Sequence, residues 1–172
     1  MLKRVAVVGA GISGLTAGYA LQKIGLEVDI FERSQSVTEF GAGITLSRNA
    51  TSLLKELGLM KLLSKKGYFP MASYIRDYKN ANVISAMNFD ESFITLDRRD
   101  LVEQLAQSFE EIGGKIHYGT EVQSINPSSG AIQISDENIN TYELILLSDG
   151  IKSSFRKEHF DNQEPQFTNY VA

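Results

Sequence analysis

The sequence predicts an α/β fold with a parallel β-sheet at its centre. A short apolar run at residues 5–8 is followed at once by glycines in the spacing G-x-G-x-x-G. A second, largely apolar run at 27–31 ends at an acidic side chain, and later segments alternate between helical and strand periodicity. Such runs are typical of buried parallel strands joined by helices. With 172 residues, 42% of them hydrophobic, the chain can bury a sizeable core.

The first strand, the glycines and the helix after them have the pattern of a dinucleotide-binding βαβ unit. Gly9 allows a tight turn, Gly11 leaves room for a pyrophosphate to approach the backbone, and Gly14 lets the helix pack closely on the strand. The N-terminus of the helix offers unpaired N–H groups and a partial positive charge to phosphates. The strand, glycines, helix, second strand and acid in this order predict a bound dinucleotide.

The acid that ends the second strand is Glu32, eighteen residues after Gly14. A carboxylate at this place can accept hydrogen bonds from both ribose hydroxyls of an adenosine, and it would repel a 2′-phosphate. Arg33 has two interpretations: it lies along the adenosine, or it is an exposed arginine in solvent.

Composition excludes several other kinds of site. The net charge is −4 and the positive residues are scattered, so we expect neither nucleic acid nor an anionic membrane surface as a partner. The chain has no cysteine, and its two histidines, His117 and His159, have no neighbours at metal-ligand spacing, so no metal site is expected. Because no signal peptide or membrane-spanning run is found, we predict a soluble cytoplasmic protein.

Periodicity predicts the later elements of the fold. They are a helix over 47–63 broken or bent at Gly58, a helix over 98–112 with Asp97 as its N-cap and Gly113-Gly114 as its end, a strand at 115–118, a hairpin over 121–134, and a buried strand at 143–147. Residues 72–89 predict a second hairpin around the polar turn 79–82, and this hairpin lies outside the nucleotide-binding sheet, in a second layer or lobe.

Four further motifs resemble those of a known family. They are the glycine-containing loop FGAGITL at 40–46, the helix start LDRRDL at 96–101, Val122, and the run DGIKSSFR at 149–156. With the glycine motif, they make the chain similar, over nearly its whole length, to the N-terminal part of the single-component FAD-dependent aromatic hydroxylases, the salicylate and hydroxybenzoate monooxygenases. The resemblance implies a Rossmann-like FAD-binding domain of the glutathione-reductase type, with a β-hairpin from an incomplete substrate domain.

The resemblance also implies a role for each motif. The 40–46 loop, with Gly43 and Thr45, would lie along the cofactor toward the flavin. Arg98 would contact the cofactor, the backbone at Val122 would lie in a strand beside the adenine, and the motif that begins at Asp149 would approach the pyrophosphate and nicotinamide region. Taken singly, each has a simpler interpretation as a turn or as an exposed ion pair.

The residues expected to bind the cofactor follow from the two arguments together. They are Gly9, Ala10, Gly11, Ile12, Ser13, Gly14, Glu32, Arg33, Gly43, Thr45, Arg98, Val122, Asp149 and Gly150. No side chain is expected to act as a catalytic acid or base. The resemblance implies that NADH or NADPH reduces FAD, that O₂ adds at flavin C4a, and that the hydroperoxide transfers one hydroxyl to a small aromatic substrate.

The resemblance further implies a division of the chain. Residues 1–70 and 96–160 would form the FAD-binding domain, 71–95 a hairpin of the substrate-domain sheet, and 161–172 the start of the substrate domain, whose remainder would follow Ala172. A fragment of this kind should be inactive by itself, and an unpaired hairpin edge favours homo-oligomers. Two alternatives stay open: a non-catalytic dinucleotide-binding or assembly module, such as half of a split enzyme, and a flavin dehydrogenase or reductase.

Overall fold

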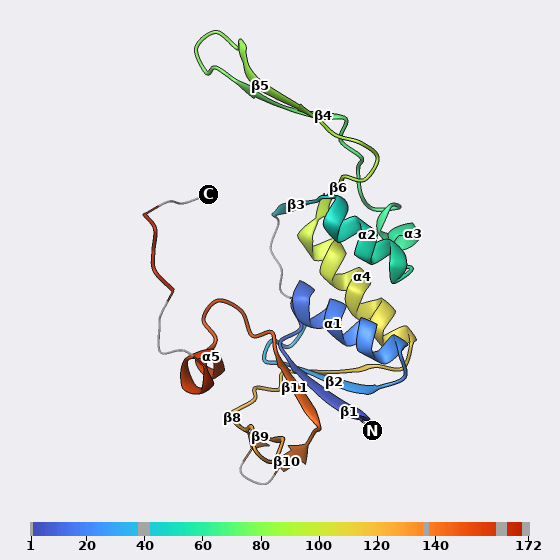
Figure 1. Ribbon diagram of the computed structural model, residues 1–172, viewed down its shortest axis with the longest axis vertical. Coiled ribbons are helices and arrows are strands. Elements are labelled where there is room, and N and C mark those ends of the chain that lie inside the picture. The colour runs from blue at the N-terminus through green and yellow to red at the C-terminus, as the bar shows by residue number, and fades with distance from the viewer. Residues whose placement is uncertain (1, 38–41, 136–137, 161–164, 170–172) are drawn as a thin grey trace. The chain divides into compact units, whose positions relative to one another are not determined.

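A computed structural model describes residues 2–37, 42–135, 138–160 and 165–169, and they form two compact units (Figure 1). The first unit comprises residues 1–38 and 105–172, and the second comprises residues 39–104. The α/β fold class predicted from the sequence is confirmed.

A four-stranded parallel sheet forms the centre of the first unit, in the order β11-β1-β2-β7. Its strands are β1 (Arg4–Val8), β2 (Glu27–Glu32), β7 (Lys115–Tyr118) and β11 (Leu144–Leu147). In β1, residues 5–8 are at most 6% exposed, so the strand is buried on both faces, as a parallel strand between two layers requires.

Helices cover one face of this sheet, and a small second sheet covers the other. Helix α1 (Ile12–Lys23) packs on β2 so closely that a Cβ on Gly18 would lie 2.8 Å from Ile30 Cδ1 and 3.4 Å from Phe109 Cε2. Phe109 belongs to the later half of α4 (Arg98–Glu111). The opposite face packs on the antiparallel sheet of β8 (Ser124–Asn126), β9 (Ala131–Ser135) and β10 (Asn138–Thr141). A core cluster that includes Ala6, Phe31 and Ile132 joins the two sheets.

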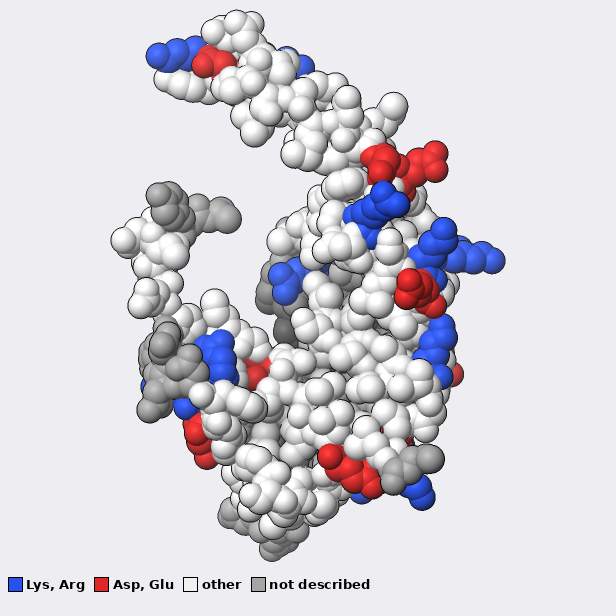
Figure 2. All heavy atoms as spheres, in the orientation of Figure 1, with Lys and Arg blue, Asp and Glu red and all other residues white. Residues whose placement is uncertain are grey.

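The second unit contains two separate antiparallel strand pairs. Strand β3 (Gly43–Leu46) pairs with β6 (Ile94–Asp97), and β4 (Ala72–Arg76) pairs with β5 (Val83–Asn88). The β4–β5 hairpin extends away from helices α2 (Arg48–Glu56) and α3 (Met60–Leu63), and its strand residues are almost all exposed (Figure 1). Lys and Arg side chains lie beside Asp and Glu over α2 and α3 (Figure 2).

Most of the predicted elements are confirmed, among them the break at Gly58 and the start of α4, and three differ. The helix over 47–63 is broken at Gly58, which has φ +84°. Helix α4 begins where the Asp97 carboxylate accepts a 2.8 Å hydrogen bond from Arg99 N–H. Residues 43–46, expected as a loop, form a strand with β6. The predicted hairpin over 121–134 has its first strand only from Ser124 and gains β10 as a third strand, and helix α5 (Ser154–His159) was not predicted.

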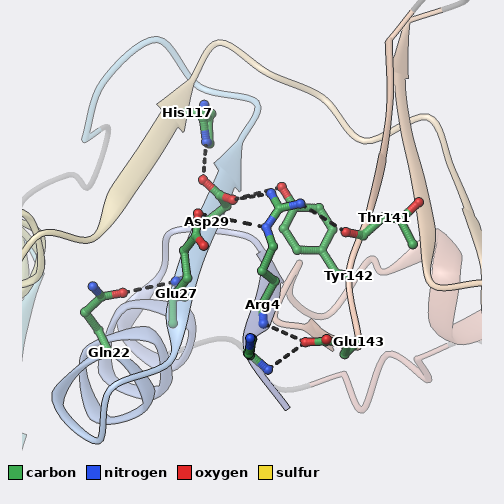
Figure 3. A network of polar contacts seen from close by, with 10 residues as sticks. Arg4, Gln22, Glu27, Asp29, His117, Thr141, Tyr142 and Glu143 are labelled. Carbon is green, nitrogen blue, oxygen red and sulfur yellow. Dashed lines mark hydrogen bonds and ion pairs between the residues drawn. The ribbon is translucent and has the colours of Figure 1, made fainter. Parts of the chain in front are cut away.

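One buried carboxylate connects three segments of the first unit. Asp29, 6% exposed in the middle of β2, lies between His117 of β7, Tyr142 after β10, and Arg4 of β1 (Figure 3). Burial raises the pKa of Asp29, but the hydrogen bonds with His117 and Tyr142 and the charges of His117 and Arg4 outweigh it, so the pKa lies below its ordinary value. Burial and the neighbouring Asp29 carboxylate raise the pKa of the Tyr142 hydroxyl.

This depressed pKa predicts a measurable dependence of stability on pH. A carboxyl whose pKa is lower in the folded state stabilises the fold above its unfolded pKa, and that contribution is lost as pH falls through the folded value. Asp29→Asn should therefore lower the free energy of unfolding by about 1–3 kcal/mol at pH 7, and by less below about pH 4. Urea unfolding of both proteins between pH 7 and pH 2.5 measures this. A difference that stays constant across that range would show that the Asp29 charge has no stabilising role.

Candidate functional site

A cavity of about 320 Å³ lies at the carboxyl ends of the central strands in the first unit. In open α/β sheets, ligands bind at the carboxyl ends of the strands, beside the strand at which the order of the strands reverses. Strand β1 is such a place, because β2 lies on one side of it and β11 on the other. The residues that line the cavity are Val8, Gly9, Gly11, Phe31, Glu32, Arg33, Ser34, Thr120, Glu121, Val122, Ser148, Asp149, Gly150, Lys152, Ser154 and Phe155.

The three glycines after β1 differ in what surrounds them. Gly9 has φ +102°, and a Cβ there would lie 2.4 Å from the backbone oxygen of Ser148. A Cβ on Gly14 would lie 2.0 Å from the oxygen of Gly9, so both positions need glycine for the fold itself. Gly11 has φ −76°, and among the described residues no atom beyond its own chain neighbours lies within 4 Å of its Cβ position. The lack of a side chain at Gly11 therefore keeps space open in the cavity, and backbone packing does not require it.

The N-terminus of α1 opens toward this space. Gly11 is its N-cap residue, no side chain caps it, and its first turn carries no acidic residue. Its first N–H groups, which include those of Ile12 and Ser13, have no helical acceptor, so they can bind an anion. Ser13 also lines a neighbouring cavity of about 510 Å³, together with Asp149 and Gly150.

Glu32 is held by the backbone around it. One carboxylate oxygen accepts a 2.8 Å hydrogen bond from the Ala10 N–H, and the other accepts one of 2.9 Å from the Ser34 N–H. These bonds fix the carboxylate beside the glycine turn. Because each carboxylate oxygen has a second lone pair, both can still accept a hydroxyl from a ligand. Arg33, the next residue, is exposed and lines the cavity.

Val122 contributes its backbone to the cavity. Its side chain is 7% exposed and packs in the core cluster that joins the two sheets. It lies two residues before β8 and not in a strand, which corrects the expectation of a strand at this position. Within the part of the chain that the structure describes, its N–H and C=O have no hydrogen-bond partner. They can offer one donor and one acceptor to the edge of a planar heterocycle.

The segment after β11 closes another side of the cavity. Gly150 has φ +88° and open space around its Cβ position, and its carbonyl accepts a hydrogen bond of 3.2 Å from Ser153 N–H. Ser153 in turn caps α5 by accepting from Arg156 N–H at 3.0 Å. The half-buried Asp149 carboxylate has no partner among the described residues. A turn and a capped helix thus hold a free carboxylate and a glycine at the cavity.

Three of the expected residues, Gly43, Thr45 and Arg98, belong to the second unit. There β3 and β6 pair with Gly43 opposite Asp97, the Thr45 and Thr95 hydroxyls are 2.9 Å apart, and Arg98 N–H donates to the Ala42 carbonyl at 3.0 Å. This pairing places Gly43 beside the start of α4. Phe40 and Gly41, in the expected glycine-containing loop, lie outside the described residues.

Sequence reasoning missed several residues of the cavity. Ser34 anchors Glu32, and its place two residues after the strand-ending acid is a signal that could have found it. Thr120 carries no such signal: its N–H donates to the Glu32 carbonyl at 2.8 Å, a contact between segments far apart in sequence. Lys152 and Phe155 also line the cavity; both lie in the 149–156 motif, of which only Asp149 and Gly150 were expected to bind the cofactor.

Neither a metal-binding cluster nor a membrane-spanning helix occurs in the described ranges. Across residues 2–37, 42–135, 138–160 and 165–169, no group of three or more His, Cys, Asp or Glu side chains could hold a metal ion. In the same ranges, every helix is too short or too polar to cross a membrane.

Comparison with known proteins gives the family. A family model described as "FAD binding domain" matches residues 3–157. The chain is 26% identical to 6-hydroxynicotinate 3-monooxygenase of Pseudomonas fluorescens, over 98% of this chain and 46% of that protein. It is 27% identical to 3-hydroxybenzoate 6-hydroxylase of Polaromonas naphthalenivorans, over 98% of this chain and 44% of that protein.

A solved structure agrees with these relatives. The tetrameric form of 2-methyl-3-hydroxypyridine-5-carboxylic acid oxygenase has a TM-score of 0.80 and 26% identity, over 87% of this chain and 40% of that one. The chain thus spans less than half the length of the relatives it matches. The match over residues 3–157 shows that the chain belongs to the FAD binding domain family, and its relatives are single-component FAD-dependent aromatic monooxygenases.

Proposed function

We propose that this chain binds FAD through its adenosine and pyrophosphate, with the cavity of the first unit as the site. The observation that carries the proposal is the open space at Gly11 beside the anchored carboxylate of Glu32. Packing among the described residues does not require a glycine at position 11, and the free space there belongs to the cavity. A ligand with an anionic group next to a ribose fits both features.

The residues of the cavity fit the parts of FAD. The N-terminus of α1, at Ala10, Ile12 and Ser13, would hold the pyrophosphate, and Glu32 would accept the ribose hydroxyls. The backbone at Val122 would meet the adenine edge, and Arg33 would lie along the adenosine. A Cβ at Gly11 would occupy part of the open space there. Its absence favours the close approach of a ligand group to the backbone.

The remaining expected residues would hold the rest of the cofactor. In this proposal Asp149 and Gly150 approach the pyrophosphate from the segment after β11, and Gly43, Thr45 and Arg98 are further residues that contact the cofactor. Gly9 and Gly14 act indirectly, because they shape the turn that presents α1. In this proposal no side chain of the cavity acts as a catalytic acid or base. The part of this chain is to bind and orient the cofactor.

We further propose that the chain acts within a cytoplasmic aromatic-ring monooxygenase with NADH or NADPH as electron donor. When bound, FAD would supply the activation of oxygen for hydroxylation of the ring. The relatives support an aromatic substrate, because their names include hydroxynicotinate and hydroxybenzoate. The β4–β5 hairpin would belong to a substrate-domain sheet, and its exposed apolar side chains, such as Tyr74, Ile75 and Ile84, favour association between copies.

Isothermal titration of the chain with FAD tests the proposal. We expect one FAD to bind per chain, and ADP-ribose to compete with it because both carry the adenosine and pyrophosphate. Riboflavin, which lacks those groups, should compete poorly. A chain that is folded by circular dichroism and binds neither FAD nor ADP-ribose would contradict the proposed function.

Replacing Glu32 should weaken the cofactor specifically. Glu32→Gln removes the charge that strengthens hydrogen bonds from the ribose hydroxyls, so FAD binding should weaken by about 1–3 kcal/mol. Titration calorimetry with FAD measures the loss. Glu27→Gln is the matched control, because Glu27 begins the same strand and does not line the cavity. Equal losses in the two variants, or none in Glu32→Gln, would refute the role of Glu32.

We expect replacement of Gly11 to affect mainly FAD binding, and replacement of Gly14 to affect mainly the stability of the fold. Gly11→Val should abolish FAD binding while costing the fold about 1 kcal/mol, as expected for an unfavourable N-cap residue. Gly14→Val should unfold the chain or lower its melting temperature strongly, because its Cβ would lie 2.0 Å from a backbone oxygen. Thermal melts with and without FAD separate the two. A Gly11→Val variant that still binds FAD as the wild type does would disprove the pyrophosphate site.

A further inference from the structure

We propose that Asp29, which does not line the cofactor cavity, is a positioning residue for it. The proposal rests on the proposed FAD site. In it, Asp29 fixes the orientation of Phe31, a residue of the cavity wall. Asp29 does so by holding the two rings between which Phe31 packs, those of His117 and Tyr142.

The two carboxylate oxygens of Asp29 each hold one ring. Oδ1 lies 2.8 Å from Nε2 of His117, and Oδ2 accepts a 3.0 Å hydrogen bond from the hydroxyl of Tyr142. Figure 3 shows Asp29 between these two side chains, with Arg4 close by at 3.4 Å. Arg4 also lies over the Tyr142 ring, with its Cζ 4.7 Å from the ring centroid. Asp29 is thus the common partner of residues from three segments.

The same two rings contact Phe31. The His117 ring stacks on Phe31, with centroids 4.9 Å apart and planes at 15°, and the Tyr142 ring meets Phe31 edge-on, at 6.0 Å and 78°. These are the two geometries that aromatic pairs prefer. Asp29 and Phe31 point to the same face of β2 because they are two residues apart in a strand. His117 lies directly opposite Phe31 in the register of β2 and β7.

Hydrogen bonds give this cluster an orientation that apolar packing does not. Apolar packing sets the position of a ring but places no requirement on its polar atoms, whereas a buried carboxylate requires both of its partners to keep their polar atoms in place. Asp29 is 6% exposed and Phe31 is 2% exposed, so both lie almost entirely within the protein, whereas the His117 side chain is 40% exposed. Fixing the His117 and Tyr142 rings therefore fixes the ring of Phe31.

The backbone of Phe31 carries the effect to the site. Its carbonyl accepts a 2.8 Å hydrogen bond from Gly9 N–H, the first residue of the glycine turn. The next residue is Glu32, whose carboxylate accepts from Ala10 N–H. A displaced Phe31 would thus disturb one wall of the cavity and both segments that the cofactor is proposed to contact.

A double-mutant cycle on FAD affinity tests this role. Calorimetry would compare the wild type, Asp29→Asn, Phe31→Leu and the double variant, at a temperature where circular dichroism shows each to be folded. We expect Asp29→Asn to raise the FAD Kd roughly five- to tenfold in the wild-type background and less than about twofold in the Phe31→Leu background. A residue that acts only on global stability would give the same ratio in both backgrounds.

Two further variants act as a control and as a substitute. Val28→Ala removes a buried side chain from the other face of the same strand, so it should lower stability without changing the FAD Kd. Tyr142→Phe keeps the ring and removes only its hydroxyl bond to Asp29. It should raise the Kd roughly threefold, and it replaces Asp29→Asn in the cycle if that variant does not fold.

The outcomes separate this inference from the proposed function. A wild-type chain that binds no FAD overturns both. If the wild type binds FAD, then an unchanged Kd in Asp29→Asn, an equal effect in both backgrounds, or an equal effect of Val28→Ala overturns the role of Asp29 alone. Loss of affinity that disappears in the Phe31→Leu background supports it.

Discussion

The close contact between the start of α1 and the end of β1 is the constraint on which the site depends. A Cβ at Gly14 would lie 2.0 Å from the carbonyl oxygen of Gly9, so the helix can begin where it does only with glycine at that position. The contact leaves the N-terminus of α1 uncapped at the carboxyl edge of the sheet. It also places the Ala10 N–H where it donates to Glu32. One steric requirement thus sets both the anion-binding end of the helix and the place of the acid.

Burial divides the polar groups of β2 into two kinds. Asp29 is almost fully buried, and its charge is balanced by Arg4 and satisfied by His117 and Tyr142. The carboxylate of Glu32 is partly exposed and bonded only to backbone N–H groups, so it keeps capacity for a ligand. Two acids three residues apart on one strand therefore have different tasks, one in holding the core and one at the cavity.

The sequence predicted the elements whose signal is local. The β1–α1–β2 unit, α4 and the 72–89 hairpin follow from periodicity and turn residues, and each is present. Strands β3 and β6 were missed because each is four residues long and its partner lies about fifty residues away. Strand β10 is polar and α5 has six residues, so neither has a clear pattern. The cavity residues Ser34 and Thr120, and the network around Asp29, depend on contacts between distant segments that periodicity does not contain.

A structure of the chain determined with FAD tests the central claim most directly. We expect density for the adenosine and pyrophosphate in the cavity of the first unit. The ribose hydroxyls should lie within hydrogen-bond distance of Glu32, and the pyrophosphate should lie over Gly11 at the N-terminus of α1. Density for FAD elsewhere on the chain, or an adenosine that does not contact Glu32, would contradict the account.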